Sequence, residues 1–316
     1  MRLALLLLLL PTAVLAQGFP SRQISIMVPY PPGSSSDLIP RALAPLLSQS
    51  MGVPVIVENR PGAGGNVGAA LVAKGDASGH LVLMAPSAIL ATNQWLYKEL
   101  NYDPQKDFTP LINAATTPNM WVAHPDVPVK TMADVVAQAR AKPGALAFAS
   151  GGNGTTGHLC GELLKTTAKV DMLHVPYKGP APALQDVIAG RVPLMCDNFS
   201  NVIPHVRSGR LKAVAVTARE RHPQAADVPT AHESGLPGFE VGVWYGFAVP
   251  SATPKPVVQK LNAEFAKALR DPKVAERLRE LGLAVVADSP EAFARFVAEE
   301  SEKMRKLVQA SGARVD

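Results

Sequence analysis

Residues 24–47, ISIMVPYPPGSSSDLIPRALAPLL, decide the fold of this chain. The stretch opens with an apolar run as long as a buried strand, and it ends with apolar residues that recur at the 3.6-residue period of a helix. Ser35, Ser36 or Asp37 is suited to cap that helix, and Pro40 is tolerated in its first turn. A strand, a loop of small residues and a helix start aim backbone N–H groups and a positive helix end at one place. The stretch therefore predicts a βα unit whose loop can bind an anion.

A second loop of the same design lies at residues 150–158, SGGNGTTGH. It follows an apolar strand and opens a helix, and like the first loop it contains hydroxyls and glycines but neither Lys nor Arg. A single loop of this kind would be interpreted as an ordinary strand-to-helix turn. The occurrence of a second loop with the same design is what favours a ligand site. Open α/β sheets bind ligands at the carboxyl ends of their strands. We therefore predict an anion held between the loops by amide dipoles and hydroxyls rather than by a salt bridge.

The chain has 316 residues, of which 47% are apolar, enough for two domains with real cores. Strands alternate with helices in two runs, which is the pattern of an α/β fold. Extended segments at 108–114, 120–123 and 239–250 interrupt this pattern, and we interpret them as crossings between the domains. We predict that residues 17–115 and 245–316 form domain 1 and that residues 116–244 form domain 2.

The first 16 residues have the pattern of a secretory signal peptide. Arg2 gives a positive start, residues 3–10 are continuously apolar, and small residues lead to an expected cleavage after Ala16. The apolar stretch is far shorter than the ~20 residues that span a bilayer. Gln17 stands after the cut where a lipid-anchored protein would have Cys. We expect a mature protein exported to the periplasm.

The composition excludes several classes of function. The formal net charge is +5, but the positive residues alternate with Glu along helices, which indicates solvated faces rather than a nucleic-acid surface. Cys160 and Cys196 are the only cysteines and lack the spacing of a metal site. An exported compartment permits a disulfide between them. Two separate buried thiols are the favoured interpretation, and the pairing stays open.

Competing motifs fail at particular positions. Gly152 and Gly157 have the spacing of a phosphate-binding P-loop, but His158 stands where that motif requires Lys. The glycines at 62–68 resemble a dinucleotide fingerprint, but Val67 occupies the third glycine position. We interpret this run as close packing at a helix start, and we expect neither a cofactor nor a metal.

The chain resembles the tripartite tricarboxylate transporter substrate-binding family, also called Bug receptors. The resemblance extends in order along nearly all of the mature chain. It is carried by the motifs VPYPPGSSSDLIPR, VENRPGAGGNVGA, LNYDPQKDFTPL, ASGGNGTTGHLCGELLK, HVPYKGPAPALQDVIAGRVPLMCDN, GRLKAVAVT and PTAHESGLPGFEV.

This resemblance implies an α/β, two-domain periplasmic-binding-protein type II fold, also called a Venus flytrap. Mixed sheets flanked by helices would be joined by two crossing strands that act as a hinge. The resemblance further implies a monomer without catalytic activity whose cleft closes on a small organic carboxylate. Its partners would be the membrane components of a tripartite tricarboxylate transporter.

The motifs also imply which residues form the site. The expected ligand contacts are Tyr30, Gly33, Ser34, Ser35, Asp37, Ser87, Asn93, Gly154, Thr155, Thr156, His158, Tyr177, Lys178 and Asp197. The remainder of the ligand would face a wall near Tyr30, Trp244 and Asp197. The family usually has a second glycine where this chain has Ser34, which would strain the loop if a positive φ were required.

Structural roles stay open for some of these residues. Asp37 and Asp197 are suited to capping, His158 to completing its own loop, Tyr177 to the core and Lys178 to solvent. Two other functions also stay open. One is an exported carboxylate-ester hydrolase, with Ser150 or Thr155 as nucleophile and His158 as base. The other is a ligand-sensing partner of a membrane signalling protein.

Overall fold

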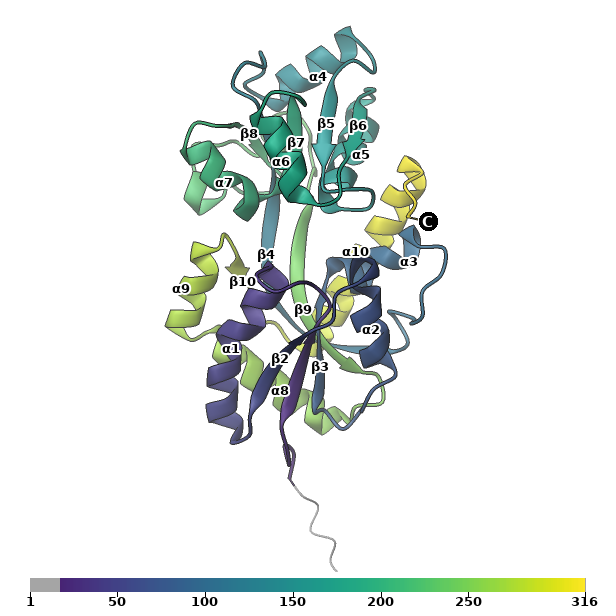
Figure 1. Cartoon of the computed structure of the whole chain (residues 1–316), viewed down its shortest axis with the longest axis vertical. Helices are drawn as coiled ribbons and strands as arrows, with labels where there is room; N and C mark the ends of the chain where they lie inside the picture. Colours follow the sequence, from purple (N-terminus) through teal and green to yellow (C-terminus); the bar gives the residue numbers. More distant parts are fainter. Residues whose placement is uncertain (1–17, 316) are drawn as a thin grey trace, which may run out of the picture.

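The structure is a computed structural model that describes residues 18–315. The signal peptide predicted at residues 1–16 lies outside this part of the chain. The described residues form two lobes, one above the other in Figure 1, with two long strands running between them. Lobe 1 is built from both ends of the chain, and lobe 2 is built from its middle.

Lobe 1 contains a parallel group of strands in the order β2, β1, β3. Its strands are β1 (Ile24–Val28), β2 (Val55–Asn59) and β3 (Leu81–Pro86). Its helices are α1 (Ser35–Met51), η1 (Ala63–Gly65), α2 (Asn66–Ala73), the π-helical turn η2 (Ala88–Thr92), α3 (Asn93–Leu96), α8 (Lys255–Leu269), α9 (Pro272–Glu280) and α10 (Pro290–Ser311). The amphipathic helix predicted from the first stretch is confirmed, because Ile39, Leu43 and Leu47 of α1 are fully buried in the core.

Lobe 2 repeats the parallel arrangement, with β5 between β6 and β7. Its strands are β5 (Ala147–Ser150), β6 (Leu173–Pro176), β7 (Leu194–Asn198) and β8 (Lys212–Val216). Its helices are α4 (Met132–Ala141), α5 (Thr156–Ala168), α6 (Pro180–Ile188), α7 (Phe199–Arg207) and η3 (Pro223–Ala225). Thr131 and Asp134 form a capping box at the start of α4, as their spacing predicts.

The strands that connect the lobes are β4 (Phe108–Ala123) and β9 (Gly242–Pro250). The extended segments predicted at 108–114 and 120–123 form one continuous strand of 16 residues. In lobe 1, β4 pairs antiparallel with β9 and with the short β10 (Ala284–Val285), and in lobe 2 it pairs antiparallel with β7 and β8. The sheets are therefore mixed, which confirms the predicted architecture.

The lobes also contact each other beside the connecting strands. Figure 1 shows α10 reaching from lobe 1 to α5 of lobe 2, where Leu159 packs against Met304 and Leu307. A groove of about 810 Å³ runs along these two helices. On the other side of the molecule, the Gln224 side-chain amide of lobe 2 donates a hydrogen bond to the Arg279 carbonyl of lobe 1.

Within residues 18–315, no helix combines the length and the apolar character needed to cross a bilayer. The same part of the chain holds no group of three or more His, Cys, Asp or Glu side chains placed to bind a metal ion.

Candidate ligand-binding site

The first loop connects β1 to α1 and depends on one positive backbone angle. Gly33 has φ +84°, a conformation that glycine adopts without strain. Ser34 has φ −72° and ψ 159°, so the serine at this position is unstrained, and its hydroxyl donates to the Pro31 carbonyl at 3.0 Å. The Asp37 and Leu38 amides donate to the Ser34 carbonyl at 2.8 and 2.9 Å, so the amides of Ser35 and Ser36 are the first-turn donors left for a ligand.

Asp37 holds this loop from inside the fold. Its carboxylate is 2% exposed and accepts hydrogen bonds from the Gly33 amide at 2.9 Å, the Arg41 guanidinium at 2.9 Å and the Asn59 side chain at 2.8 Å. Burial alone would raise the pKa of Asp37, but these donors outweigh burial and lower it. The carboxylate is thus charged and fully engaged within the protein.

The glycine-rich turn at 62–68 packs closely at the start of α2, as predicted, and it lies beside the first loop. The Tyr30 hydroxyl donates to the Gly64 carbonyl at 3.0 Å. Asn93, at the start of α3, donates to the Asn66 side chain at 2.6 Å, so its amide is engaged within lobe 1. Ser87 lies between β3 and η2 and is buried. A side chain at Gly68 would collide with Pro29, which explains the small residue there.

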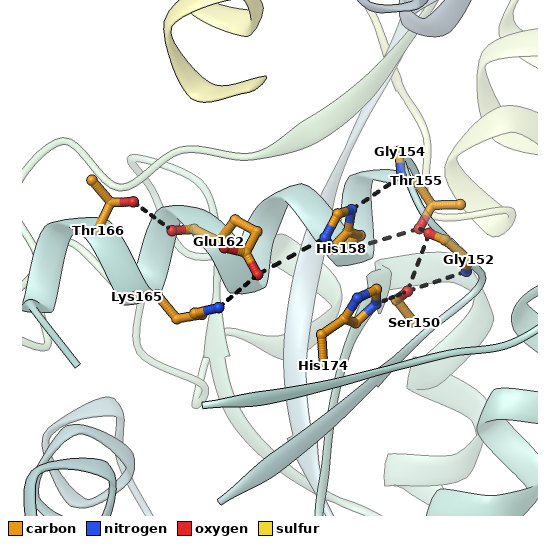
Figure 2. Close-up of polar contacts among 9 residues, drawn as sticks. All are labelled: Ser150, Gly152, Gly154, Thr155, His158, Glu162, Lys165, Thr166 and His174. Carbon is orange, nitrogen blue, oxygen red and sulfur yellow. Dashed lines mark hydrogen bonds and ion pairs between the residues drawn. The ribbon is translucent and has the colours of Figure 1, made fainter. Parts of the chain in front are cut away.

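The second loop connects β5 to α5 and is organised by its own hydrogen bonds (Figure 2). Thr155 is the N-cap of α5: its hydroxyl accepts from the His158 amide at 3.4 Å and donates to the Gly152 carbonyl at 2.8 Å. His158 accepts at Nδ1 from the Gly154 amide at 3.0 Å. The positive φ of Gly154, +79°, lets the backbone turn here. The alternative that His158 completes its own loop is therefore borne out.

Thr156 faces the end of strand β7. Its Oγ1 lies 3.4 Å from the side-chain oxygens of both Asn119 and Asn198. The start of α5 approaches β7 so closely that a Cβ on Gly157 would lie 2.3 Å from the Cys196 carbonyl oxygen. Cys160 of α5 and Cys196 of β7 form a disulfide at this contact, so the interpretation as separate thiols was wrong.

Two stacked histidines lie beneath the second loop. The rings of His158 and His174 are 4.1 Å apart and nearly parallel. Burial lowers the pKa of His158, and burial together with the neighbouring His158 and Lys165 charges lowers the pKa of His174 to about 4. Glu162 accepts from Lys165 at 3.1 Å and lies 3.9 Å from His158. Both imidazoles are therefore neutral near pH 7.

The arrangement required by the hydrolase alternative is not present at these residues. The Ser150 hydroxyl contacts His174 at 2.7 Å rather than His158, and Ser150 is fully buried. Thr155 is used as a helix cap and His158 as a loop acceptor. A nucleophile must reach its substrate, and the buried Ser150 hydroxyl instead joins Gly152 within the loop.

Tyr177 and Lys178 lie on the turn before α6, beside the second loop. The Tyr177 hydroxyl donates to Asp186 of α6 at 2.7 Å, and its ring packs with the core beneath that helix. Lys178 is exposed on the turn before α6. The backbone of this turn meets the second loop, because the Tyr177 amide donates to the Ser150 carbonyl at 3.1 Å and the Gly179 amide donates to the Gly151 carbonyl at 3.0 Å.

Asp197 is a buried carboxyl without a cation among its hydrogen-bond partners. It is 7% exposed and accepts from the Asn201 side chain at 3.1 Å. Burial raises the pKa of Asp197 to about 6, opposed by hydrogen bonds from Asn201 and the Asn198 amide. Burial also raises the pKa of Tyr245, on β9, to about 12, opposed by a hydrogen bond with Ser35, and the Asp197 charge adds to the increase. Tyr245 thus connects the first loop with the end of β7.

Trp244, expected near the ligand wall, is buried against the last helix. Successive side chains on a strand point to opposite faces, so only one of Trp244 and Tyr245 can face the loops. Trp244 packs against Phe293 and Phe296 of α10, at ring distances of 5.4 and 5.6 Å. Tyr245, rather than Trp244, lies near Ser35 and Asp197. The sequence pattern did not point to Tyr245, nor to His174, Asn119 and Asn198 beside the second loop.

Comparisons with known proteins agree with this architecture. A family model described as the tripartite tricarboxylate transporter family receptor, TctC, matches residues 39–313. A UPF0065 protein in the tcbD-tcbE intergenic region of Pseudomonas sp. (strain P51) is 41% identical over 92% of this chain and 87% of its own length. Protein BugT of Bordetella pertussis is 35% identical over 96% of this chain and 93% of its own length.

Solved structures are similar over the same extent. Rpa4515 of R. palustris with adipate has a TM-score of 0.83 and 36% identity, covering 94% of this chain and 99% of that one. MatC (Rpa3494) from Rhodopseudomonas palustris with bound malate has a TM-score of 0.79 and 35% identity, covering 92% of this chain and all of that one. The periplasmic binding protein BugD has a TM-score of 0.79 and 35% identity, covering 94% of this chain and 99% of that one. This chain therefore belongs to the tripartite tricarboxylate transporter receptor family of periplasmic solute-binding proteins.

Proposed function

We propose that this protein captures a small organic carboxylate between its lobes in the periplasm and delivers it to the membrane components of a tripartite tricarboxylate-type transporter. The observation that carries the proposal is the pair of similar loops, each at the carboxyl end of a strand and each opening a helix. Such loops hold anions with backbone amides and hydroxyls. The adipate and malate bound by two related structures support the same ligand class.

The ligand carboxylate would lie on the groups that the fold leaves available. In the first loop these are the Ser35 and Ser36 amides, and in the second loop they are the amides that open α5 before His158. The hydroxyls of Ser35 and Thr156 would turn to the ligand from Tyr245 and from Asn119 and Asn198. Asp37 would act indirectly, because its carboxylate already binds internal donors and would repel an anionic ligand.

Binding would close the two lobes as domains, with residues 17–115 and 245–316 moving against residues 116–244. The strands β4 and β9 connect the lobes and would act as the hinge. A ligand that contacts both loops gains its full set of contacts only in the closed state, and so shifts the population towards that state. The protein would work as a monomer and without catalysis.

A thermal-shift screen of the mature protein, residues 17–316, tests this function. The panel pairs small carboxylic acids with their neutral amides. A ligand present at a hundred times its dissociation constant adds about 2.7 kcal/mol to the free energy of unfolding. We expect a clear shift with at least one acid and none with its amide.

Protein that has been unfolded, freed of co-purified ligand and refolded serves as the control. If this protein also shows no shift with any acid, the carboxylate proposal is wrong. Turnover of a carboxylate ester would instead support the hydrolase. Carboxylate binding without uptake in cells that carry the transporter would support a signalling partner.

A further inference from the structure

His174 occupies a position that the proposed site does not yet explain. It lies on β6, beside β5, and its ring is stacked between two others. The centroid of the Phe148 ring, on β5, lies 5.0 Å from that of His174, with an interplanar angle of 24°. The centroid of the His158 ring, on α5, lies 4.1 Å from it, with an interplanar angle of 15°. Figure 2 shows His174 between the start of the second loop and the first turn of α5. The ring therefore joins three elements that surround the loop.

One contact of His174 fixes the start of the loop. Its Nε2 lies 2.7 Å from the hydroxyl of Ser150, the last residue of β5. The same hydroxyl accepts from the Gly152 amide at 3.1 Å and lies 3.2 Å from the Gly152 carbonyl. Because Ser150 is fully buried, water cannot replace a lost partner, and the first turn of the loop depends on this contact.

The other contact fixes the end of the loop. His158 must keep its ring oriented so that Nδ1 accepts the Gly154 amide at 3.0 Å. Stacking on His174 holds the plane of that ring. The charged groups that act on the pair, Glu162 and Lys165, both lie on α5, while β5 presents the uncharged Phe148 and Ser150. The low pKa of each histidine keeps both rings neutral near pH 7, and His158 must be neutral for its Nδ1 to accept from the Gly154 amide.

We propose that His174 is a positioning residue for ligand binding: it holds both ends of the loop at residues 150–158 in the geometry that receives the carboxylate. The inference rests on the proposed function, because it assigns this role within the loop proposed to hold the ligand. His174 itself would not contact the ligand.

Paired substitutions separate the hydrogen bond from the stack. His174→Phe keeps an aromatic ring beside His158 but removes the imidazole Nε2 that contacts the Ser150 hydroxyl. His174→Gln places an amide near the position of Nε2 and restores that partner without a ring. The matched control is His232→Phe, since His232 also accepts a glycine amide, that of Gly238 at 3.0 Å, but lies in an exposed loop. All variants are first checked for folding by circular dichroism.

Affinity is measured by calorimetry at pH 7 with the best acid from the thermal-shift panel. We expect about tenfold weaker binding for His174→Phe, in line with the loss of one buried hydrogen bond, and recovery to within about threefold for His174→Gln. His232→Phe should bind like the unsubstituted protein. Unchanged affinity in both His174 variants would overturn the positioning role, whereas equal losses in both would show that the stack holds the loop as firmly as the hydrogen bond does.

Hydrogen exchange of the ligand-free proteins tests the same role without any ligand. Amides at residues 151–158 should exchange faster in His174→Phe than in His174→Gln, while the last turns of α5 exchange alike. Unchanged loop exchange would refute the inference even if carboxylate binding is established. Conversely, if no acid binds, the proposed function fails while faster loop exchange still supports the role of His174 in holding the loop.

Discussion

Removing the disulfide between Cys160 and Cys196 should lower the stability of lobe 2 by several kcal/mol. The bridge closes a loop across a sequence separation of 36 residues. The chain-entropy relation for a loop of that length gives about 3.8 kcal/mol at 25 °C. Both sulfurs lie in fully buried surroundings, so replacing both residues by Ala removes little besides the bridge and the two sulfur atoms.

The measurement is urea unfolding of the Cys160→Ala/Cys196→Ala double variant and the unsubstituted protein, followed by circular dichroism. With a slope of ~1–3 kcal/mol per molar urea, the midpoint should fall by at least ~1 M. The unsubstituted protein in a reducing agent is the control, and its midpoint should approach that of the variant. Equal midpoints would refute the entropy argument, and two free thiols titrated in the denatured, unreduced protein would refute the bridge itself.

Three further substitutions test other parts of the site. Thr156→Val should weaken carboxylate binding more than tenfold by calorimetry, because the ligand would lose a proposed hydrogen bond worth ~1–3 kcal/mol, and an unchanged affinity would remove Thr156 from the site. Because the folded pKa of Asp197, about 6, lies above its ordinary 3.8, the folded state holds a proton that the unfolded state has released, and stability is lost as pH rises through this window. Asp197→Asn cannot titrate, so its stability relative to the unsubstituted protein should increase by about 2 kcal/mol between pH 4 and pH 7 in urea unfolding, and a constant difference would contradict the assignment. Gly33→Ala and Gly154→Ala both place a side chain at positive φ, costing ~1–2 kcal/mol, but a Cβ at 154 would also lie 2.6 Å from Leu96, whereas the space beside Gly33 is open. Thermal unfolding should therefore show the greater loss for Gly154→Ala, and equal losses would exclude the contact with Leu96.

Much of the fold could be predicted because its signals are local. The first strand lies where its apolar run predicts, and the capping box fixes the start of α4. The long strand β4 was predicted as two pieces because polar residues at 116–119 interrupt its apolar pattern. The structure buries Thr117 and Asn119 at the crossing, where the Asn119 amide donates to the Val241 carbonyl and the Asn119 carbonyl accepts from the amide and the hydroxyl of Thr217. Only the pairing of distant strands makes those polar residues part of the interior.

The site was predictable in its loops but not in the residues that support them. The glycines and hydroxyls of each loop are contiguous in sequence, so their pattern is visible. The contacts of Tyr245 with Ser35 and of His174 with Ser150 depend on strand order, which the pattern does not reveal. The cysteine pair was misjudged for the same reason, since a bridge requires α5 to lie against β7.

The packing of α10 on α5 has a consequence for laboratory evolution. Leu159 follows the second loop by a single residue and packs against Met304 and Leu307 of the last helix. A substitution that reshapes this contact would tilt α5 and shift the amides at its start by a fraction of an ångström. Selections for growth on a new carbon source should therefore recover substitutions around residues 304–308, as well as in the loops. Libraries confined to the loops would miss them.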